Sequence, residues 1–157
     1  MSEPPLPARV GQQLGIFATR YQALIERLLA PHDLTFAQFA VLLHLARRGE
    51  PGRVSEVAAA VELTQPAVTK ILQKFASLGL VEILRDARDG RNRPARLTAA
   101  GLARVGDVQR SFAPAFDRLL AGWTADGLEH LITDLARLTE RMDEMEGGAV
   151  GCPTSNA

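Results

Sequence analysis

The sequence predicts a mainly α-helical protein with one small antiparallel β-ribbon, in which a compact lobe is flanked by N- and C-terminal helices. Over most of the chain, apolar residues recur at three- and four-residue steps, the period of an α-helix. The exception is residues 80–97, where two short apolar runs flank an arginine-rich loop, a pattern typical of a hairpin. A chain of 157 residues can bury one such core without disulfide bonds.

The N-terminal third is expected to hold a disordered arm and two helices. Residues 1–8 contain three prolines and should be a loose arm, and residues 9–30 carry a helical apolar stripe. Thr35 and Gln38 form a capping box at the start of the next helix, which should end at Gly49. This second helix is apolar nearly all round, so we expect it to be central and buried.

Residues 50–98 are predicted to form the lobe. Ser55 is expected to cap a short helix that reaches Val61, and a brief turn leads to a longer helix that Gly79 closes. Short helix, tight turn and longer helix make a helix-turn-helix, to which the ribbon adds a wing. One face of the longer helix should meet the core, and the opposite face is uncharged or cationic. The core face carries Val68, Ile71, Leu72, Phe75 and Leu78; the other carries Pro66, Thr69, Lys70, Gln73 and Ser77, with Lys74 at its edge.

Residues 99–146 are predicted to form two long helices, capped by Thr98 and Thr124, with a kink near Pro114. Residues 147–157 are expected to be disordered. The first helix and the last two carry more apolar surface than one core requires, which predicts a homodimer.

The distribution of charge favours a polyanionic partner although the formal net charge is zero. Residues 64–98 hold seven basic and three acidic side chains, a local charge of +4, whereas residues 121–157 hold two and seven, a local charge of −5. The local field, not the total, steers a polyanion. We therefore expect double-stranded DNA as partner, with the longer helix in the major groove and the ribbon on the backbone or minor groove.

The ribbon's tip contains an informative triplet, Asp89-Gly90-Arg91. Gly90 permits a turn with positive φ, and Asp89 can hold the Arg91 guanidinium in one orientation. An oriented arginine suits a narrow minor groove. The alternative is that Asp89 and Arg91 form only an ion pair within the loop. A surface ion pair contributes only about 0 to 1 kcal/mol to stability, so this alternative gives a weaker reason for the highly charged tip.

Several functional classes find no support in the sequence. Cys152 is the single cysteine, there is no signal-peptide pattern, and no apolar run approaches the ~18 residues of a membrane span, so a cytoplasmic protein is expected. Phosphate-binding loops, nucleophile elbows and paired zinc histidines are missing, which argues against an enzyme and against a cofactor. The three histidines lie on separate elements without ligand spacing, so no metal site is predicted.

Four motifs give the chain a resemblance to a known family. They are Gln65-Pro66-Ala67-Val68-Thr69-Lys70, Leu78-Gly79-Leu80-Val81, Asp89-x-Arg91 and Leu97-Thr98-x-x-Gly101. Together they resemble the MarR family of transcription regulators, named for multiple antibiotic resistance, over residues 9–146. The resemblance implies a homodimeric winged helix-turn-helix regulator, a repressor, that grips a near-palindromic operator. It implies DNA contacts from Thr64, Gln65, Pro66, Ala67, Thr69, Lys70, Lys74, Arg88, Asp89 and Arg91.

Two departures from the family pattern bear on function. Lys70 stands where arginine is commoner, which replaces a planar fork by a point charge and lowers base selectivity. The first helix lacks the reactive cysteine of peroxide-sensing members, and Cys152 in the tail is a poor substitute.

The resemblance also implies release from DNA by a small aromatic or phenolic effector. The residues expected to line its cleft are Phe17, Arg20, Tyr21, His44 and Phe116. The alternative is that these rings belong to the core, as helically spaced aromatic residues usually do. An alternative function is a winged helix that binds proteins or mediates dimerisation without reading DNA. Such a module should present an apolar anchor where this chain presents Lys70, Lys74 and Arg91.

Overall fold

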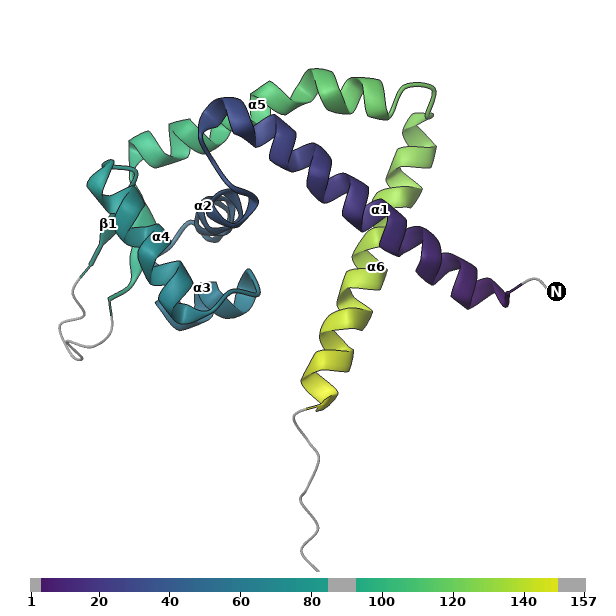
Figure 1. Ribbon diagram of the computed structural model, residues 1–157, viewed down its shortest axis with the longest axis horizontal. Helices are drawn as coiled ribbons and strands as arrows, with labels where there is room; N and C mark the ends of the chain where they lie inside the picture. The colour runs from purple at the N-terminus through teal and green to yellow at the C-terminus, as the bar shows by residue number, and fades with distance from the viewer. Residues whose placement is uncertain (1–3, 85–92, 150–157) are drawn as a thin grey trace, which may run out of the picture. The chain divides into compact units, whose positions relative to one another are not determined.

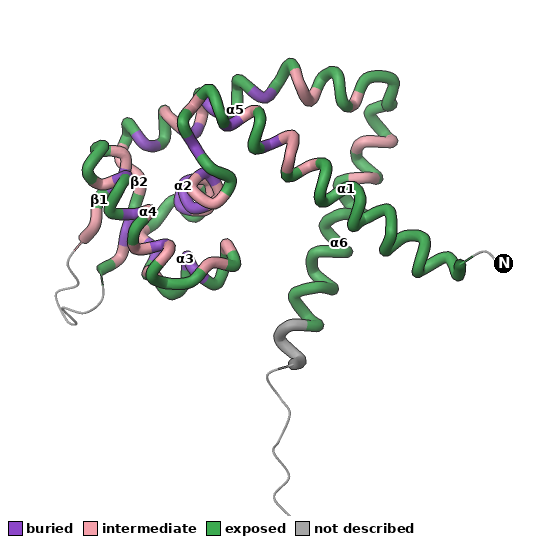
Figure 2. The backbone as a smooth tube through the Cα atoms, viewed as in Figure 1, coloured by how far each residue is buried: buried purple, intermediate pink, exposed green. Residues whose placement is uncertain are grey.

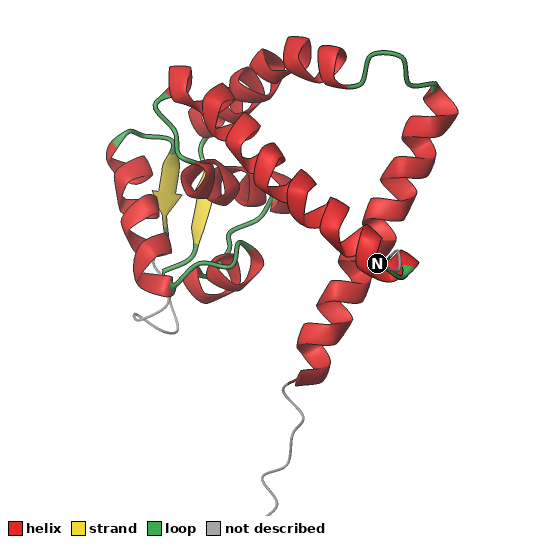
Figure 3. Ribbon diagram, turned by 45° about the vertical axis from the view of Figure 1, so that its right-hand side comes forward, coloured by secondary structure: helices red, strands yellow, loops and turns green. Residues whose placement is uncertain are grey.

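The computed structural model describes residues 4–84 and 93–149, with side chains to residue 145. Its elements confirm a mainly helical protein with a two-stranded antiparallel ribbon (Figures 1 and 3). In chain order they are α1 (Leu6–Leu29), the 3₁₀ turn η1 (Ala30–His32), α2 (Phe36–Arg48), α3 (Val54–Ala60), α4 (Gln65–Ser77), β1 (Val81–Ile83), β2 (Ala95–Leu97), α5 (Ala99–Leu119) and α6 (Ala125–Ala149). The chain divides after Pro114 into two compact units.

Helix α2 is the centre of the first unit, as its apolar sequence predicts. It contacts α1, α3, α4 and β2, and its Val41, Leu42 and Leu45 are buried (Figure 2). Phe39 meets Phe112 of α5 with ring centroids 5.7 Å apart. The lobe predicted at residues 50–98 therefore shares one compact unit with α1, α2 and the first part of α5.

The start and end of α2 follow the predicted local chemistry. The Thr35 hydroxyl accepts from the Gln38 N–H at 3.2 Å, and the Gln38 side chain accepts from the Thr35 N–H at 3.2 Å. Gly49 ends the helix in the left-handed region, at φ +71°. This capping box fixes where the central helix begins.

Several predicted boundaries are wrong. Helix α1 begins at Leu6, within the expected arm, because proline is well suited to the first turn of a helix, where its missing N–H is not needed. Helix α3 begins at Val54, and Ser55 is not its cap: the Arg53 N–H donates to the Glu56 carboxylate at 3.2 Å. Helix α6 continues to Ala149, into the stretch expected to be disordered. Leu78 is 59% exposed instead of joining the core stripe of α4.

The ribbon pairs Val81 with Leu97, Glu82 with Arg96 and Ile83 with Ala95. Gly52 extends it, because its backbone exchanges two hydrogen bonds of 2.9 Å with Ala95. Since Gly52 pairs as a single residue, it leaves no alternating apolar and polar pattern in the sequence, and the sequence therefore does not predict this addition to the ribbon.

The junction between α4, the ribbon and α5 is held by a short set of contacts. The Thr98 hydroxyl donates to the Gly79 carbonyl at 2.7 Å and accepts from the Gly101 N–H at 3.1 Å. The Thr98 N–H donates to the Leu80 carbonyl at 3.0 Å. Gly101 is buried against Leu80, where a Cβ would overlap the Leu80 carbonyl oxygen. These contacts give the Leu97-Thr98-x-x-Gly101 motif a structural reason.

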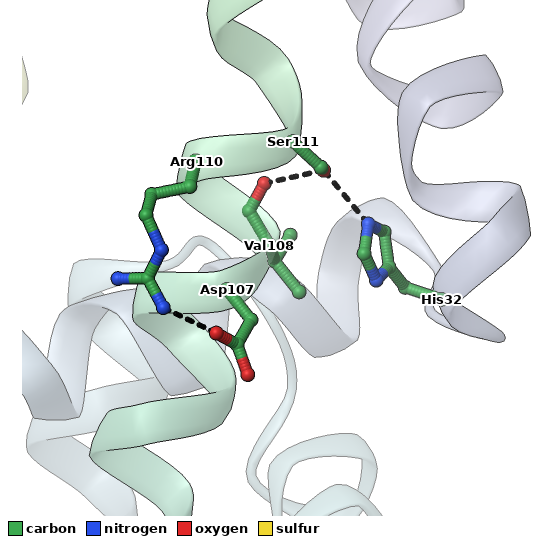
Figure 4. Close-up of polar contacts among 5 residues, drawn as sticks. All are labelled: His32, Asp107, Val108, Arg110 and Ser111. Carbon is green, nitrogen blue, oxygen red and sulfur yellow. Dashed lines mark hydrogen bonds and ion pairs between the residues drawn. The ribbon is translucent and has the colours of Figure 1, made fainter.

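A second set of contacts ties η1 to α5 within the first unit (Figure 4). The Ser111 hydroxyl donates its proton to the Val108 carbonyl at 2.7 Å, so the His32 Nε2, 2.8 Å from the same oxygen, is the donor in the other bond. Arg104 donates to the His32 carbonyl at 2.6 Å. His32 therefore has a structural role between the α1–α2 turn and α5.

The second unit comprises the end of α5 and helix α6. Helix α5 continues through Pro114 to Leu119, and the kink expected there stays a prediction. Apolar side chains on α6 are exposed in the single chain: Ile132, Leu135, Leu138, Met142 and Met145.

In the described part of the chain, no single helix is long and apolar enough to cross a bilayer. Residues 6–32 and 36–48 together have the length and apolar composition of a membrane span, but the two segments are bent by 84° relative to each other.

Candidate nucleic-acid interface

Helix α4 presents one face to the core and the other to solvent. Thr64 caps it, since its hydroxyl accepts from the Ala67 N–H at 3.4 Å. Val68, Leu72 and Phe75 are buried, at 0%, 2% and 1% exposure, and hold the helix against the lobe. The predicted outer residues Gln65, Pro66, Lys70, Gln73 and Lys74 are exposed, and Ala67 and Thr69 are half-buried.

The turn before α4 sets the direction of the helix. Glu62 takes the left-handed conformation at φ +53°, and the Leu63 N–H donates to the Ala58 carbonyl at 3.0 Å. Few non-glycine residues adopt this conformation. The tight reversal brings α3 and α4 into contact as a helix-turn-helix.

The exposed face of α4 is cationic and its lysines are unpaired. Lys70 and Lys74 form no ion pair with any described residue, and no acidic side chain lies within α4. Two hydroxyls are already engaged: Thr69 donates to the Gln65 carbonyl at 2.9 Å and Ser77 to the Lys74 carbonyl at 2.6 Å. New hydrogen bonds from this face must therefore come from lysine and glutamine side chains, whereas Thr69 can still accept one.

A groove of about 390 Å³ adjoins this face. Helix α4 supplies Gln65, Thr69, Leu72 and Gln73 to its wall. The start of α3 adds Arg53, Val54 and Ser55, and the wing adds Ile83 and Arg93. No local signal in the sequence distinguishes Arg53, which precedes the expected start of the short helix, or Arg93, one of several arginines in the ribbon.

The wing arginines have different surroundings. Arg96 is neutralised by Glu82, its cross-strand partner, through contacts of 2.9 and 2.7 Å to one carboxylate oxygen. Arg93 is exposed and makes no such pair with a described residue. The predicted tip contacts Arg88, Asp89 and Arg91 lie outside the described residues.

A second, apolar pocket of about 340 Å³ lies in the first unit. Its walls come from α1, α2 and α5: Tyr21, Ile25, Phe36, Phe39, Ala40, Leu43, Gln109 and Phe112. Its α2 residues recur at helical spacing, and the sequence predicts this helix to be part of the core instead of the wall of a pocket.

The predicted effector residues mostly lie outside this pocket. Tyr21 lines it, and Phe17, which is 51% exposed, stacks on Tyr21 with ring centroids 5.5 Å apart. Arg20 is exposed. His44 follows Leu43 on α2 but does not line the pocket. Its Nε2 is buried and has no hydrogen-bond partner among the described residues. Phe116 belongs to the second unit. Arg20 and His44 do not line this pocket, and the five-residue effector cleft stays a prediction.

Metal binding has no visible site in the described ranges, where no three His, Cys, Asp or Glu side chains lie close enough to share an ion.

The arrangement of α3, α4 and the ribbon is a winged helix-turn-helix. A model of the MarR family matches residues 32–92. The HTH-type transcriptional repressor IacR of Pseudomonas putida is 30% identical over 112 residues, which are 71% of this chain and 66% of that repressor. A cysteine-to-serine mutant of MarR from E. coli is 25% identical, with a TM-score of 0.72 over 88% of this chain and 99% of that one. The same mutant complexed with operator DNA is 24% identical, with a TM-score of 0.66 over 86% and 99%. The chain belongs to the MarR family of transcription regulators.

Proposed function

We propose that the protein is a cytoplasmic, homodimeric transcription repressor that binds a near-palindromic DNA operator through α4 and the wing. The observation that carries this proposal is the exposed face of α4, which is cationic, free of acidic residues and unpaired among the described residues. The similarity to a transcriptional repressor of Pseudomonas putida supports the sign of regulation.

The chemistry of α4 suits the major groove, which is roughly 12 Å wide and admits one helix. The amides of Gln65 and Gln73 can each make the paired donor and acceptor contacts that adenine offers. Lys70 can reach a guanine edge or a phosphate, and the methyl group of Thr69 suits a thymine methyl. Since Lys70 is a point charge and not a fork, we expect moderate base selectivity.

The alternative, a winged helix that binds a protein partner, fits this face less well. Protein-binding surfaces are anchored by buried aromatic or aliphatic side chains. The exposed face of α4 carries none before Leu78, a single leucine at its C-terminal end. The charge of the face favours DNA.

Replacing Arg91 tests the wing. Arg91→Ala should weaken operator binding by about 1 to 3 kcal/mol, because it removes an oriented guanidinium from the minor groove, and should leave the melting temperature unchanged. Fluorescence anisotropy with labelled operator measures the effect. Arg27→Ala, which removes the same charge from an exposed position on α1, is the matched control. Equal operator affinity of Arg91→Ala and the parent would refute the wing contact.

The dimer proposal rests on exposed apolar side chains. On α1, Leu6, Val10, Leu14 and Phe17 follow a helical stripe at 39% to 68% exposure. On α6, the stripe from Ile132 to Met145 is 39% to 76% exposed. Apolar stripes of this length on a monomer mark an interaction surface. In our proposal a second copy of the chain covers the apolar stripes of α1 and α6. The resulting dimer places its two α4 helices about 34 Å apart, or a multiple of that distance, so that they meet successive major grooves.

A charge placed on the α6 stripe tests this dimer. Ile132→Glu should shift the light-scattering mass from about twice the 17.0 kDa chain mass toward 17.0 kDa, because a carboxylate would be buried unpaired in the interface. Thr133→Glu adds the same charge to the polar side of the helix and should leave the mass unchanged. An unaltered mass for Ile132→Glu, or a parent protein of single-chain mass, would remove the proposal.

For the effector, we propose that the apolar pocket receives a small aromatic or phenolic ligand. Among the described residues its wall contains no charged side chain, and Tyr21 and Gln109 are the polar ones. This wall favours a neutral phenol over a carboxylate, since an unpaired charge is costly in an apolar site. Release of DNA requires that the ligand bind more tightly to one conformation of the dimer than to the other. The favoured conformation would be the one in which the spacing of the two winged lobes does not match successive major grooves.

Filling the pocket tests the effector proposal. In Ala40→Leu, the added carbons should occupy ligand space and raise the phenol concentration that displaces labelled operator by about tenfold, the loss expected when roughly 1.4 kcal/mol of binding is removed. Operator affinity without ligand should stay at the parent value and is the internal control. Identical displacement curves for parent and variant would place the ligand elsewhere.

A further inference from the structure

We propose that the groove between α3, α4 and the wing seats a phosphate of the DNA backbone, held by Arg53 and Arg93. This inference rests on the proposed DNA-binding function and adds a contact that is independent of base sequence. Its basis is the composition of the groove, the lack of ion pairs between its two arginines and the described residues, and its continuity with the exposed face of α4.

The composition of the groove suits an anion. Its volume is about 390 Å³, and the described residues of its lining include two arginines and no acidic residue. Its other polar side chains are the hydroxyls of Ser55 and Thr69 and the amides of Gln65 and Gln73. Guanidinium groups bind phosphate oxygens through paired, charge-assisted hydrogen bonds, and hydroxyl and amide groups commonly contact the DNA backbone.

Glu50 and Glu56, each three residues from Arg53 in sequence, both pair with the Arg48 guanidinium. One Glu56 oxygen accepts from the Arg53 backbone N–H at 3.2 Å and pairs with the Arg48 guanidinium at 3.0 Å. The Arg53 guanidinium forms no ion pair with a described residue, and neither does that of Arg93. Two guanidinium groups in one groove repel each other, and an anion between them removes this repulsion.

The position of the groove fits a strand beside the bases that α4 reads. Gln65 and Thr69 line the groove and also a shallow surface that they share with Pro66 and Lys70. A helix in the major groove lies between two sugar-phosphate strands, so a surface on its flank meets a strand and not a base edge. Arg53 approaches that strand from α3 and Arg93 from the base of the wing.

The experiment measures the dissociation constants of the full-length protein for its operator and for a scrambled duplex of equal length, over a series of KCl concentrations. Arg53→Gln and Arg93→Gln should each weaken binding to both duplexes by the same factor, about tenfold. Each should also reduce the magnitude of the slope of log K against log salt by about 1.8, because the proposed homodimer loses one phosphate contact in each subunit and each contact contributes about 0.9. Arg53→Lys should keep the parent slope, because it keeps the charge. Arg27→Gln on α1 removes a charge outside the groove and should change neither quantity.

The outcomes separate this inference from the DNA-binding proposal. If the parent binds operator in a salt-dependent way but both glutamine variants keep the parent slope, the phosphate seat is wrong and the function stands. A changed ratio between operator and scrambled duplex would also overturn it, since it would show that the arginines read bases. A parent that binds neither duplex refutes the function itself. Arg93 is not at a helix end, so its variant tests the groove even if Arg53→Gln perturbs α3.

Discussion

Gly101→Ala is expected to destabilise the protein by at least about 3 kcal/mol, a large fraction of the stability of a typical domain. The added methyl group would overlap the Leu80 carbonyl oxygen and lie 3.0 Å from a Leu97 methyl. Backbone cannot rotate away as a flexible side chain can, so α5 would have to separate from the start of the ribbon. Urea unfolding followed by circular dichroism measures the loss.

The same helix provides the control. At Gly106 a Cβ would meet the far end of the flexible Arg110 side chain at 3.2 Å, which can move. Gly106→Ala should therefore stabilise the protein by about 0.5 to 1 kcal/mol through helix propensity. Equal effects at Gly101 and Gly106 would show that the contact of α5 with Leu80 does not decide the stability.

Operator affinity should fall by about 10³- to 10⁵-fold between 50 and 200 mM salt, as is typical when about 6 to 10 phosphates are contacted. The total charge of the chain is zero, so this dependence must come from its uneven distribution. Lysines of α4 and arginines of the wing displace counterions from the backbone wherever they touch it. Anisotropy titrations with labelled operator at several KCl concentrations give the slope.

The protein-binding alternative predicts a different salt response. A partner held by apolar anchors would show weak dependence on salt, because few counterions are released. A scrambled duplex of equal length should show a similar slope at lower affinity, since phosphate contacts do not depend on sequence. A flat response with operator DNA would count against the whole DNA-binding proposal.

Local chemistry made most of the fold predictable. The capping box at Thr35, the closing glycine at Gly49 and the alternation of core and solvent faces along α4 are decided by neighbouring residues, and each has its predicted place. Errors arose where two local signals compete. Near Leu6 the prolines indicated an arm although they also suit a first helical turn. At α3 Ser55 resembled a cap, although Arg53 is the N-cap residue and its N–H donates to the Glu56 carboxylate.

The sequence by itself determined the fold class, the family resemblance and the cationic face of α4, because periodicity and short motifs are properties of adjacent residues. The tertiary structure decided which of those residues act together. Arg96 is neutralised by a strand partner fourteen residues away, Arg53 and Arg93 line one groove although forty residues separate them in sequence, and Gly101 is constrained by Leu80. Such relations depend on distances that folding alone creates, so the sequence does not distinguish Arg93 from Arg96, whereas the structure does.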